Sequence, residues 1–397
     1  MDSEASNPRG AEVLARRAAA SRISLALNFA AVAVFADLYT TQPILPILSQ
    51  QFGVSAGTAG LTISVVVLMI AIISAAYGFL SDALGRKPVM VAACVLLAVP
   101  TLLCAAAPTF EVLLVFRALQ GLLMPGVTAV AVAYLGDHYA GAELGPKVGG
   151  WIAASVAGGL TGRVASGLIA SLIHWRAPFL FFGLTTLGAA VALGRLLPRQ
   201  QVTQRIQLAM AYRGMFGHFR SRRLLGSFII GGGVFFATIG IFTYLPYYLT
   251  APPFLLSTAI VSSIYLVYLA GVATSLVTGR LARNVSGQVI MGVGLAVAAL
   301  GVLTTEIRSL PAVLVGLVVL CIGMFTVQST APAFVNANAA VAKGGAGALY
   351  TSFYYFGASF GSALPGYALQ TWGWTGVVGS CIGALVIGVL ADVLLCR

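Results

Sequence analysis

The sequence is poor in charged residues. Only 8% of the 397 residues are Asp, Glu, Lys or Arg, whereas 59% are hydrophobic. This is too little polar surface to cover a water-soluble fold of that size, so the lipid bilayer must be the solvent of most of the chain. The apolar runs are about 20 residues long, as a spanning helix requires, and not alternating segments of about 10. The sequence therefore predicts an all-α membrane protein and argues against an outer-membrane barrel.

The few cysteines and histidines exclude several kinds of chemistry. The sequence has five cysteines, without a CxxC or Cys/His spacing, and three histidines at or beyond the ends of the apolar runs. This pattern argues against a metal site, a disulfide framework and a catalytic triad. No phosphate-binding loop is present in the sequence, which argues against ATP-driven pumping. We therefore expect neither an enzyme nor a bound cofactor or metal.

The apolar runs predict about twelve transmembrane helices. They lie near residues 23–49, 57–81, 88–107, 110–135, 147–171, 177–197, 224–249, 255–280, 288–306, 310–333, 344–369 and 374–395. The only long hydrophilic interval inside the chain is basic and has several glutamines, which suits a partly helical amphipathic segment on the membrane surface. We therefore predict a cytoplasmic tail (1–22), an N-terminal six-helix bundle (23–197), a basic linker (198–223) and a C-terminal six-helix bundle (224–397).

Basic residues are distributed unequally between alternate gaps. If the N-terminus is cytoplasmic, the outer gaps carry only Arg176 and Arg308, whereas the inner gaps include seven arginines from Arg195 to Arg223. Because Lys and Arg are enriched in cytoplasmic loops, this asymmetry predicts that both termini are cytoplasmic. The same asymmetry explains the net charge of +12, so we expect no nucleic-acid partner.

The two halves of the sequence share an internal repeat with an offset near 200 residues. Three landmarks recur at offsets of 200, 201 and 199 residues, namely Leu45-Pro46 and Leu245-Pro246, Gly78 and Gly279, and Trp175 and Trp374. Such internal symmetry is typical of transporters built from a duplicated helical unit. A substrate would then bind near the midplane, between the halves.

The segment from Gly78 to Pro88, between the second and third spans, reads GFLSDALGRKP. Its glycines permit a tight turn and close helix approach, Asp82 can lie at a helix N-terminus, and Arg86 can pair with a carboxylate, for which Asp137 is the candidate. Positive-inside topology alone would explain the two basic residues but not the Gly/Asp/Gly spacing. The segment closely resembles the signature loop of the major facilitator superfamily. That resemblance implies a gating loop made of Gly78, Asp82, Gly85, Arg86, Lys87 and Asp137.

Other segments extend the resemblance. Leu113–Gly121, with Arg117 and Gln120, resembles the fourth-helix motif of the family, in which an arginine faces the central cavity. Residues 38–46 (LYTTQPILP) resemble the first-helix pattern of the twelve-span drug:proton antiporters. The fifth span departs from the export-type pattern, because it reads GGLTGR at 158–163 where a Gly-Pro pair is usual. Over its whole length the chain resembles bacterial permeases of the arabinose-efflux-like or drug:proton antiporter-like kind.

The resemblance implies an alternating-access transporter in the inner (cytoplasmic) membrane of a bacterial cell. It implies twelve helices in two pseudo-symmetric bundles and a monomeric protein. Its expected partners are a small-molecule substrate, protons and membrane lipid.

Three charged residues lie deep inside predicted spans, namely Asp37, Arg117 and Arg163. A charge at the bilayer centre costs at least about 2.5–3.5 kcal/mol, so each requires a reason. Asp37 is the only carboxylate placed deep in a span and is the candidate proton carrier. Burial and a nearby arginine change a carboxyl pKa in opposite directions, so Arg117 could tune the exchange of a proton. The alternative is a static pair in which Asp37 and Arg117 only lock the first and fourth helices together.

Arg163 allows two interpretations. It could bond helix carbonyls as part of the structure, or it could bind an anionic group of the substrate. Two arginines and one ionised aspartate would leave the cavity net positive, which favours anionic or zwitterionic cargo. The predicted cavity residues are Tyr39, Gln42, Arg117, Gln120, Arg163, Tyr244, Tyr265, Tyr268, Gln328, Tyr350 and Tyr354.

The primary hypothesis from the sequence is proton-coupled export of a small organic solute by antiport. A second hypothesis is an importer or uniporter of a small anionic or zwitterionic solute, in which Asp37 and Arg117 form a structural pair. A third is a membrane receptor that does not transport.

Overall fold

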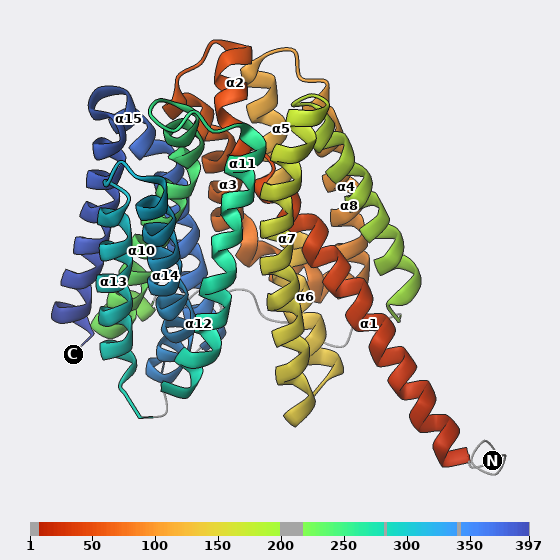
Figure 1. The fold of residues 1–397 in the computed structure, drawn as a ribbon. Coiled ribbons are helices and arrows are strands. Elements are labelled where there is room, and N and C mark those ends of the chain that lie inside the picture. The colour runs from red at the N-terminus through yellow and green to blue at the C-terminus, as the bar shows by residue number, and fades with distance from the viewer. Residues whose placement is uncertain (1–7, 199–216, 282–283, 340–342, 397) are drawn as a thin grey trace, which may run out of the picture.

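The computed structural model describes residues 8–198, 217–281, 284–339 and 343–396, and these residues form helices and no strands (Figure 1). Eleven segments of the described chain are long and apolar enough to cross a bilayer. The last of them, α15 (Lys343–Leu395), contains two helices joined at Gly373, whose φ of 61° is not helical. The prediction of twelve spanning helices is therefore confirmed.

The helices fall into two groups of six spans that lie side by side in Figure 1. The N-terminal group contains α1 (Pro8–Tyr39), η1 (Gln42–Ile44), α2 (Leu45–Phe52), α3 (Ala56–Leu84), α4 (Arg86–Ala105), α5 (Phe110–Leu123), α6 (Pro125–His138), η2 (Gly141–Glu143), α7 (Leu144–Leu172) and α8 (Ala177–Leu196). The C-terminal group contains η3 (His218–Arg220), α10 (Arg222–Thr250), α11 (Thr258–Ile264), η4 (Tyr265–Val267), α12 (Tyr268–Leu281), α13 (Gly287–Thr304), α14 (Leu310–Asn338) and α15.

The boundaries of three predicted segments differ in the structure. The predicted tail is helical from Pro8 onward, because it continues into the first span as α1. Most of the predicted linker, residues 199–216, lies outside the described residues, and α10 begins at Arg222. The eighth span begins at Thr258, within a few residues of the predicted start, but it is interrupted by η4.

Two further predicted spans are broken at proline-containing segments. The first span is not one helix, because α1 ends at Tyr39 and the chain continues through η1 and α2, each with a proline in its first turn. The fourth span is divided into α5 and α6 just before Pro125. Proline has no N–H and cannot donate the helical bond, so the carbonyls before each break need other partners.

The two halves repeat one helix contact, which supports the duplication. In α7, a Cβ on Gly158 would lie 2.6 Å from the Val32 carbonyl oxygen of α1. In α15, a Cβ on Gly357 would lie 2.0 Å from the Gly232 carbonyl oxygen of α10, so the same pair recurs about 200 residues later. One turn further on, Gly162 and Gly361 make the corresponding contacts with Ala36 and Phe236, each at 2.3 Å. Small residues allow this close packing of membrane helices.

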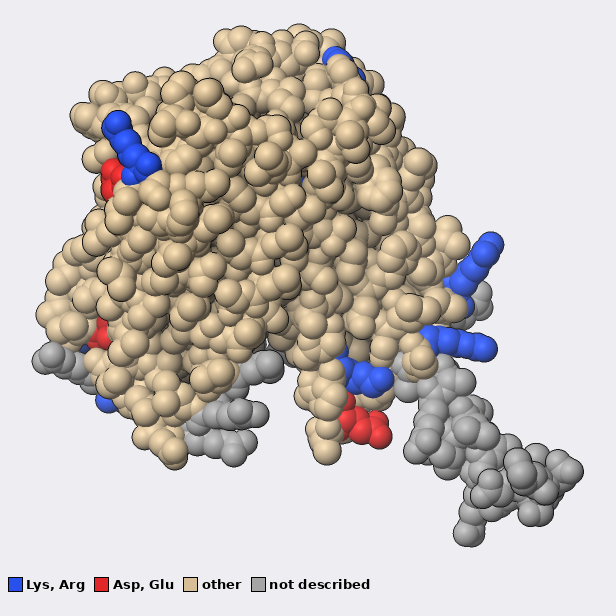
Figure 2. All heavy atoms as spheres, viewed as in Figure 1, with Lys and Arg blue, Asp and Glu red and all other residues tan. Residues whose placement is uncertain are grey.

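The halves are joined at one side and separated at the other. Hydrogen bonds between them link Ser64 Oγ to Ser359 Oγ (2.9 Å) and Ser49 Oγ to the Tyr247 hydroxyl (2.5 Å). In Figure 1 the helices diverge toward the lower side, where both chain ends lie, and Figure 2 shows a notch between the halves there. Most of the visible basic residues gather along the same lower side in Figure 2. The space between the halves therefore opens on the side of the chain ends.

Candidate functional site

A cavity of about 400 Å³ lies between the two halves. Helices α1 and α7 supply its wall from the N-terminal half, and α10, α12, α14 and α15 supply the wall from the C-terminal half. Of the residues predicted for the cavity, the structure places five in its wall, namely Tyr39, Arg163, Tyr268, Gln328 and Tyr354. Residues of both halves therefore meet around one space, as a midplane substrate site requires.

Among the described residues of the cavity wall, Arg163 alone is charged. Its guanidinium carbon lies 3.6 Å from the centre of the Tyr39 ring and 4.8 Å from that of Tyr268, which are cation–π distances. Nε donates to Gln42 Oε1 at 2.6 Å, and Nη1 donates to the Gly159 carbonyl at 2.9 Å. Arg163 forms no ion pair with any described residue, and its side chain is 4% exposed. A buried guanidinium without a carboxylate partner is suited to bind an anionic group.

Gln42 connects Arg163 to the opposite half. Its Oε1 accepts from Arg163, and its Nε2 donates to Thr243 Oγ1 of α10 at 3.0 Å. Gln42 is fully buried at the start of η1, directly after the break in the first span. A change in the position of either half would therefore alter the hydrogen bonds of the cavity arginine.

Asp37 is enclosed in the N-terminal half, two residues before Tyr39, and its side chain is fully buried. Its Oδ2 accepts from Thr101 Oγ1 at 2.7 Å, and its Oδ1 accepts from Gln120 Nε2 at 3.2 Å. Both donors are neutral, so the carboxylate has no direct cationic partner among the described residues. Asp37 can gain or lose a proton without breaking an ion pair.

Arg117 bonds the backbone of α1 and not the Asp37 carboxylate. Its guanidinium donates to the backbone carbonyls of Asp37 (3.1 Å), Leu38 (2.7 Å) and Thr62 (2.9 Å), and to Gln120 Oε1 (2.7 Å). The alternative interpretation, a static ion pair between Arg117 and the Asp37 carboxylate, has no direct contact among the described residues, whereas the tuning of Asp37 by Arg117 stays a prediction. Because α1 ends at Tyr39, its last carbonyls lack helical donors, and Arg117 supplies them. Arg117 therefore stabilises the break in the first span, and Gln120 connects it to the carboxylate.

The remaining predicted cavity residues lie behind the wall. The Tyr244 hydroxyl donates to the Ser362 carbonyl (2.5 Å), and the Tyr265 hydroxyl donates to the Phe242 carbonyl (2.8 Å). The Tyr265 ring nevertheless contacts the site, because its centre lies 5.6 Å from the Arg163 guanidinium carbon. Tyr350 is buried beside Gly231, where a Cβ would lie 2.6 Å from its ring. Gln42 bonds the cavity residue Arg163, whereas Arg117 and Gln120 bond each other, and Gln120 bonds Asp37.

The structure also adds residues that the sequence prediction missed. Trp151, Phe235, Phe325 and Tyr355 line the cavity, and the Phe235 and Tyr354 rings stack at 3.7 Å. Asp392, in the last turn of α15, is a second buried carboxylate and is 6% exposed. It lies outside the central cavity.

The predicted gating loop forms a compact cluster within the N-terminal half. Arg86, the first residue of α4, has its Nη2 2.9 Å from Asp82 Oδ1 and its Nε 2.5 Å from Asp137 Oδ2. Gly85 has a φ of 92°, which requires glycine, whereas a Cβ on Gly78 would meet no atom within 4 Å. The predicted close approach at Gly78 is therefore wrong. Asp82 lies in the last turn of α3 and not at a helix N-terminus, because α3 extends to Leu84.

Lys87 fastens the same loop to the end of the N-terminal half. Its Nζ donates to the Leu197 carbonyl, just after α8. In the C-terminal half, Gln288 Nε2 donates to the Asp392 carbonyl at 3.2 Å, near the end of α15. The corresponding helix ends are thus tied together in both halves, by a lysine in one and an amide in the other.

Comparisons with known proteins agree with this architecture. The family model of the Major Facilitator Superfamily matches residues 27–343. The inner membrane transport protein YnfM of Escherichia coli (strain K12) is 33% identical over 378 residues, which cover 95% of this chain and 91% of that protein. The MFS-type transporter YybF of Bacillus subtilis (strain 168) is 30% identical over 368 residues, which cover 92% of this chain and 91% of that protein.

Solved structures show the same fold. A bacterial homolog of the human lysosomal transporter Spinster, in an inward-facing and unoccupied conformation, aligns with a TM-score of 0.77 at 15% identity, covering 94% of this chain and 95% of that chain. A D-xylose-proton symporter aligns with a TM-score of 0.74 at 16% identity, covering 94% and 96%. At these identities the likeness concerns the fold alone.

Proposed function

Because the chain belongs to the major facilitator superfamily, whose members move small molecules across membranes by alternating access, we propose that it exports a small zwitterionic solute in exchange for protons. The proposal places it as a monomer in the bacterial inner membrane. The observation that carries it is the buried Arg163, which has no carboxylate partner among the described residues and faces a cavity rich in aromatic rings.

The cavity offers a complementary group for each end of a zwitterion. The anionic end would bind the Arg163 guanidinium, which is already oriented by Gln42 and Tyr39. The cationic end would bind the aromatic rings opposite, among them Phe235 and Tyr354. The space opens on the side of the chain ends, and the distribution of basic residues predicts that this side is cytoplasmic, so cargo would enter from inside the cell.

Asp37 would carry the proton. Asp37 does not line the cavity, so its protonation would act through its hydrogen bonds to Thr101 and Gln120. Cargo at Arg163 and a proton on Asp37 would favour different positions of the break in the first span and would exclude each other. That exclusion is what antiport requires. The two sites are connected through the break in the first span, because Arg117 holds the Asp37 and Leu38 carbonyls directly before Tyr39, which stacks on Arg163.

The same charges favour a second function for a different cargo. A purely anionic solute at Arg163 and a proton on Asp37 would bind cooperatively, because each makes the other's site more favourable. Cooperative binding gives symport, and the protein would then act as an importer. A uniporter would show solute flux without any proton movement.

The test is transport in proteoliposomes that contain a pH-sensitive dye and are exposed to anionic, zwitterionic and cationic solutes in turn. We expect zwitterionic solutes to move protons opposite to the solute, and we expect Arg163→Gln to abolish this selectivity. Proton movement in the same direction as an anion would establish the importer. Solute binding without flux in the parent protein would overturn transport and favour the receptor.

A further inference from the structure

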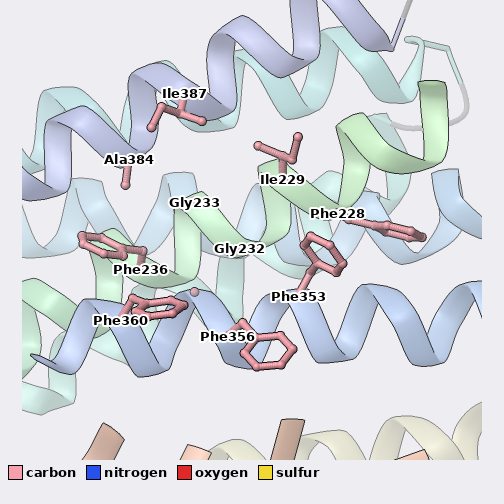
Figure 3. A pocket seen from close by; sticks show the side chains of 11 residues that line it. Phe228, Ile229, Gly232, Gly233, Phe236, Phe353, Phe356, Phe360, Ala384 and Ile387 are labelled. Atoms are coloured by element: carbon pink, nitrogen blue, oxygen red, sulfur yellow. The ribbon is translucent and has the colours of Figure 1, made fainter. Parts of the chain in front are cut away.

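A second cavity lies in the C-terminal half, away from the cavity between the halves. It has a volume of about 400 Å³ and is lined by α10 and by both helical parts of α15 (Figure 3). All of its side chains are hydrocarbon, with aromatic rings at Phe228, Phe236, Phe353, Phe356 and Phe360. We call this cavity the phenylalanine groove. Without a polar side chain it cannot orient a water-soluble solute.

The phenylalanine groove opens at the apolar surface of the protein. Phe360 is 54% exposed and Ile387 is 58% exposed, and both lie at its rim in Figure 3. In a membrane protein, apolar side chains exposed in this way contact lipid. The groove is therefore filled from the bilayer.

Two glycines bring α10 close to α15 at the floor of the groove. Gly232 and Gly233 of α10 form the floor of the groove, and at the corresponding positions 200 residues earlier the chain has Val32 and Ala33. The close contact of α10 with α15 at Gly357 is nevertheless repeated in the other half at Gly158. A Cβ on Gly232 would lie 3.0 Å from the Phe353 carbonyl oxygen, and a Cβ on Gly233 would lie 2.8 Å from the Ala384 carbonyl oxygen. Both glycines therefore allow α10 to pack closely against the two parts of α15, and the groove lies between the phenylalanine rings beside this contact.

Two arginines lie at one end of the phenylalanine groove. Arg222 is seven residues before Ile229, which places it on the same face of α10 about 10 Å away. Arg220 follows Phe219, whose ring centre lies 6.1 Å from that of Phe353 in the groove wall. Arg220 and Arg222 are exposed and have no hydrogen-bond or ion-pair partner among the described residues.

We propose that the phenylalanine groove holds one acyl chain of an anionic phospholipid whose phosphate binds Arg220 and Arg222. The apolar groove and the two cations match the two parts of such a lipid. Arg222 lies about 10 Å along α10 from Ile229, and the headgroup layer is about 5–7 Å thick on each side of a bilayer, so an arginine at this position lies at the level of the headgroups. The positive-inside rule places both arginines at the inner leaflet, where anionic lipids attract Lys and Arg.

The test is native mass spectrometry of the purified full chain in detergent, titrated with phosphatidylglycerol or with neutral phosphatidylcholine. The parent should retain one phosphatidylglycerol more tightly than phosphatidylcholine. The double variant Arg220→Gln/Arg222→Gln should bind phosphatidylglycerol about 30-fold more weakly, because two cations near the phosphate are lost. Ala384→Phe, which fills the groove, should weaken the binding of both lipids.

The matched control is Arg195→Gln, which removes an exposed cation at the end of α8 in the other half. It should leave lipid binding unchanged, and an equal loss in this variant would show that only general surface charge matters. If Ala384→Phe lowers the unfolding temperature, Ala384→Leu replaces it. The proposal is overturned if the double variant binds phosphatidylglycerol as the parent does, or if a filled groove retains full affinity. It is also overturned if the groove variants abolish a protein dimer instead of a lipid adduct.

Discussion

Arg117→Lys separates the charge of Arg117 from its geometry. The guanidinium makes four hydrogen bonds with three different nitrogen atoms, three of them to backbone carbonyls at 2.7–3.1 Å. An ammonium group keeps the charge but presents its donors from a single atom, so it cannot reach Thr62, Leu38 and Gln120 together. Loss of one or two such bonds, with the Leu38 carbonyl left buried without a partner, should lower the free energy of unfolding by about 2–3 kcal/mol.

This free energy can be measured by reversible unfolding in mixed detergent micelles, followed by tryptophan fluorescence. Arg222→Lys is the control, since an exposed arginine without a partner among the described residues should change stability by less than about 0.5 kcal/mol. Adding Asp37→Asn to Arg117→Lys should not restore stability, because the lost bonds go to backbone carbonyls and to Gln120. If Arg117→Lys is as stable as the parent, Arg117 acts through its charge alone and the interpretation as a helix-end donor is wrong.

Three further predictions concern packing, the loop and the cavity. Gly357→Ala should destabilise the protein by about 1–3 kcal/mol, because its Cβ would lie 2.0 Å from a carbonyl oxygen. The control Gly347→Ala, in the same helix, meets no atom within 4 Å and should stabilise the protein by up to about 1 kcal/mol. Equal effects of the two substitutions in the same unfolding assay would contradict the packing. Arg86→Gln should lower the free energy of unfolding by only about 1 kcal/mol, because the ion pairs of Arg86 are partly exposed. The same variant should slow transport several-fold. An unchanged transport rate would show that the loop has no role in gating. Arg163→Lys should weaken solute binding about tenfold in calorimetry, because the planar group with two donors is lost. Arg163→Gln should weaken it about 100-fold, because the charge is lost as well. Affinities equal to that of the parent in both variants would show that Arg163 is structural.

The architecture could be predicted because it depends on composition. A spanning helix needs a long apolar run, and such runs are visible in the sequence, as are the prolines and the recurring landmarks. The burial of Asp37, Arg117 and Arg163 also followed from their position in these runs, and the structure places all three inside the protein. The hydropathy pattern could not reveal that Asp392, only three residues before the end of α15, is buried as well.

The partners of the buried residues could not be predicted in the same way. Helices in a membrane are apolar on all sides, so no pattern shows which tyrosines face the cavity, and Tyr268 lines it while Tyr265, three residues earlier, bonds a backbone carbonyl. The role of Arg117 depends on where α1 ends. Once that end is known, the need for donors at the Asp37 and Leu38 carbonyls follows from helix geometry.

Proton movement in the variant Asp37→Asn tests the proposed coupling most directly. Asparagine has nearly the same size as aspartate and can still form hydrogen bonds, but it cannot take up a proton. Asp392→Asn provides a control at a buried carboxylate outside the cavity. We predict that zwitterion-dependent proton movement in proteoliposomes disappears in Asp37→Asn and persists in Asp392→Asn. Unchanged proton movement in Asp37→Asn would contradict the assignment of Asp37 as the proton carrier.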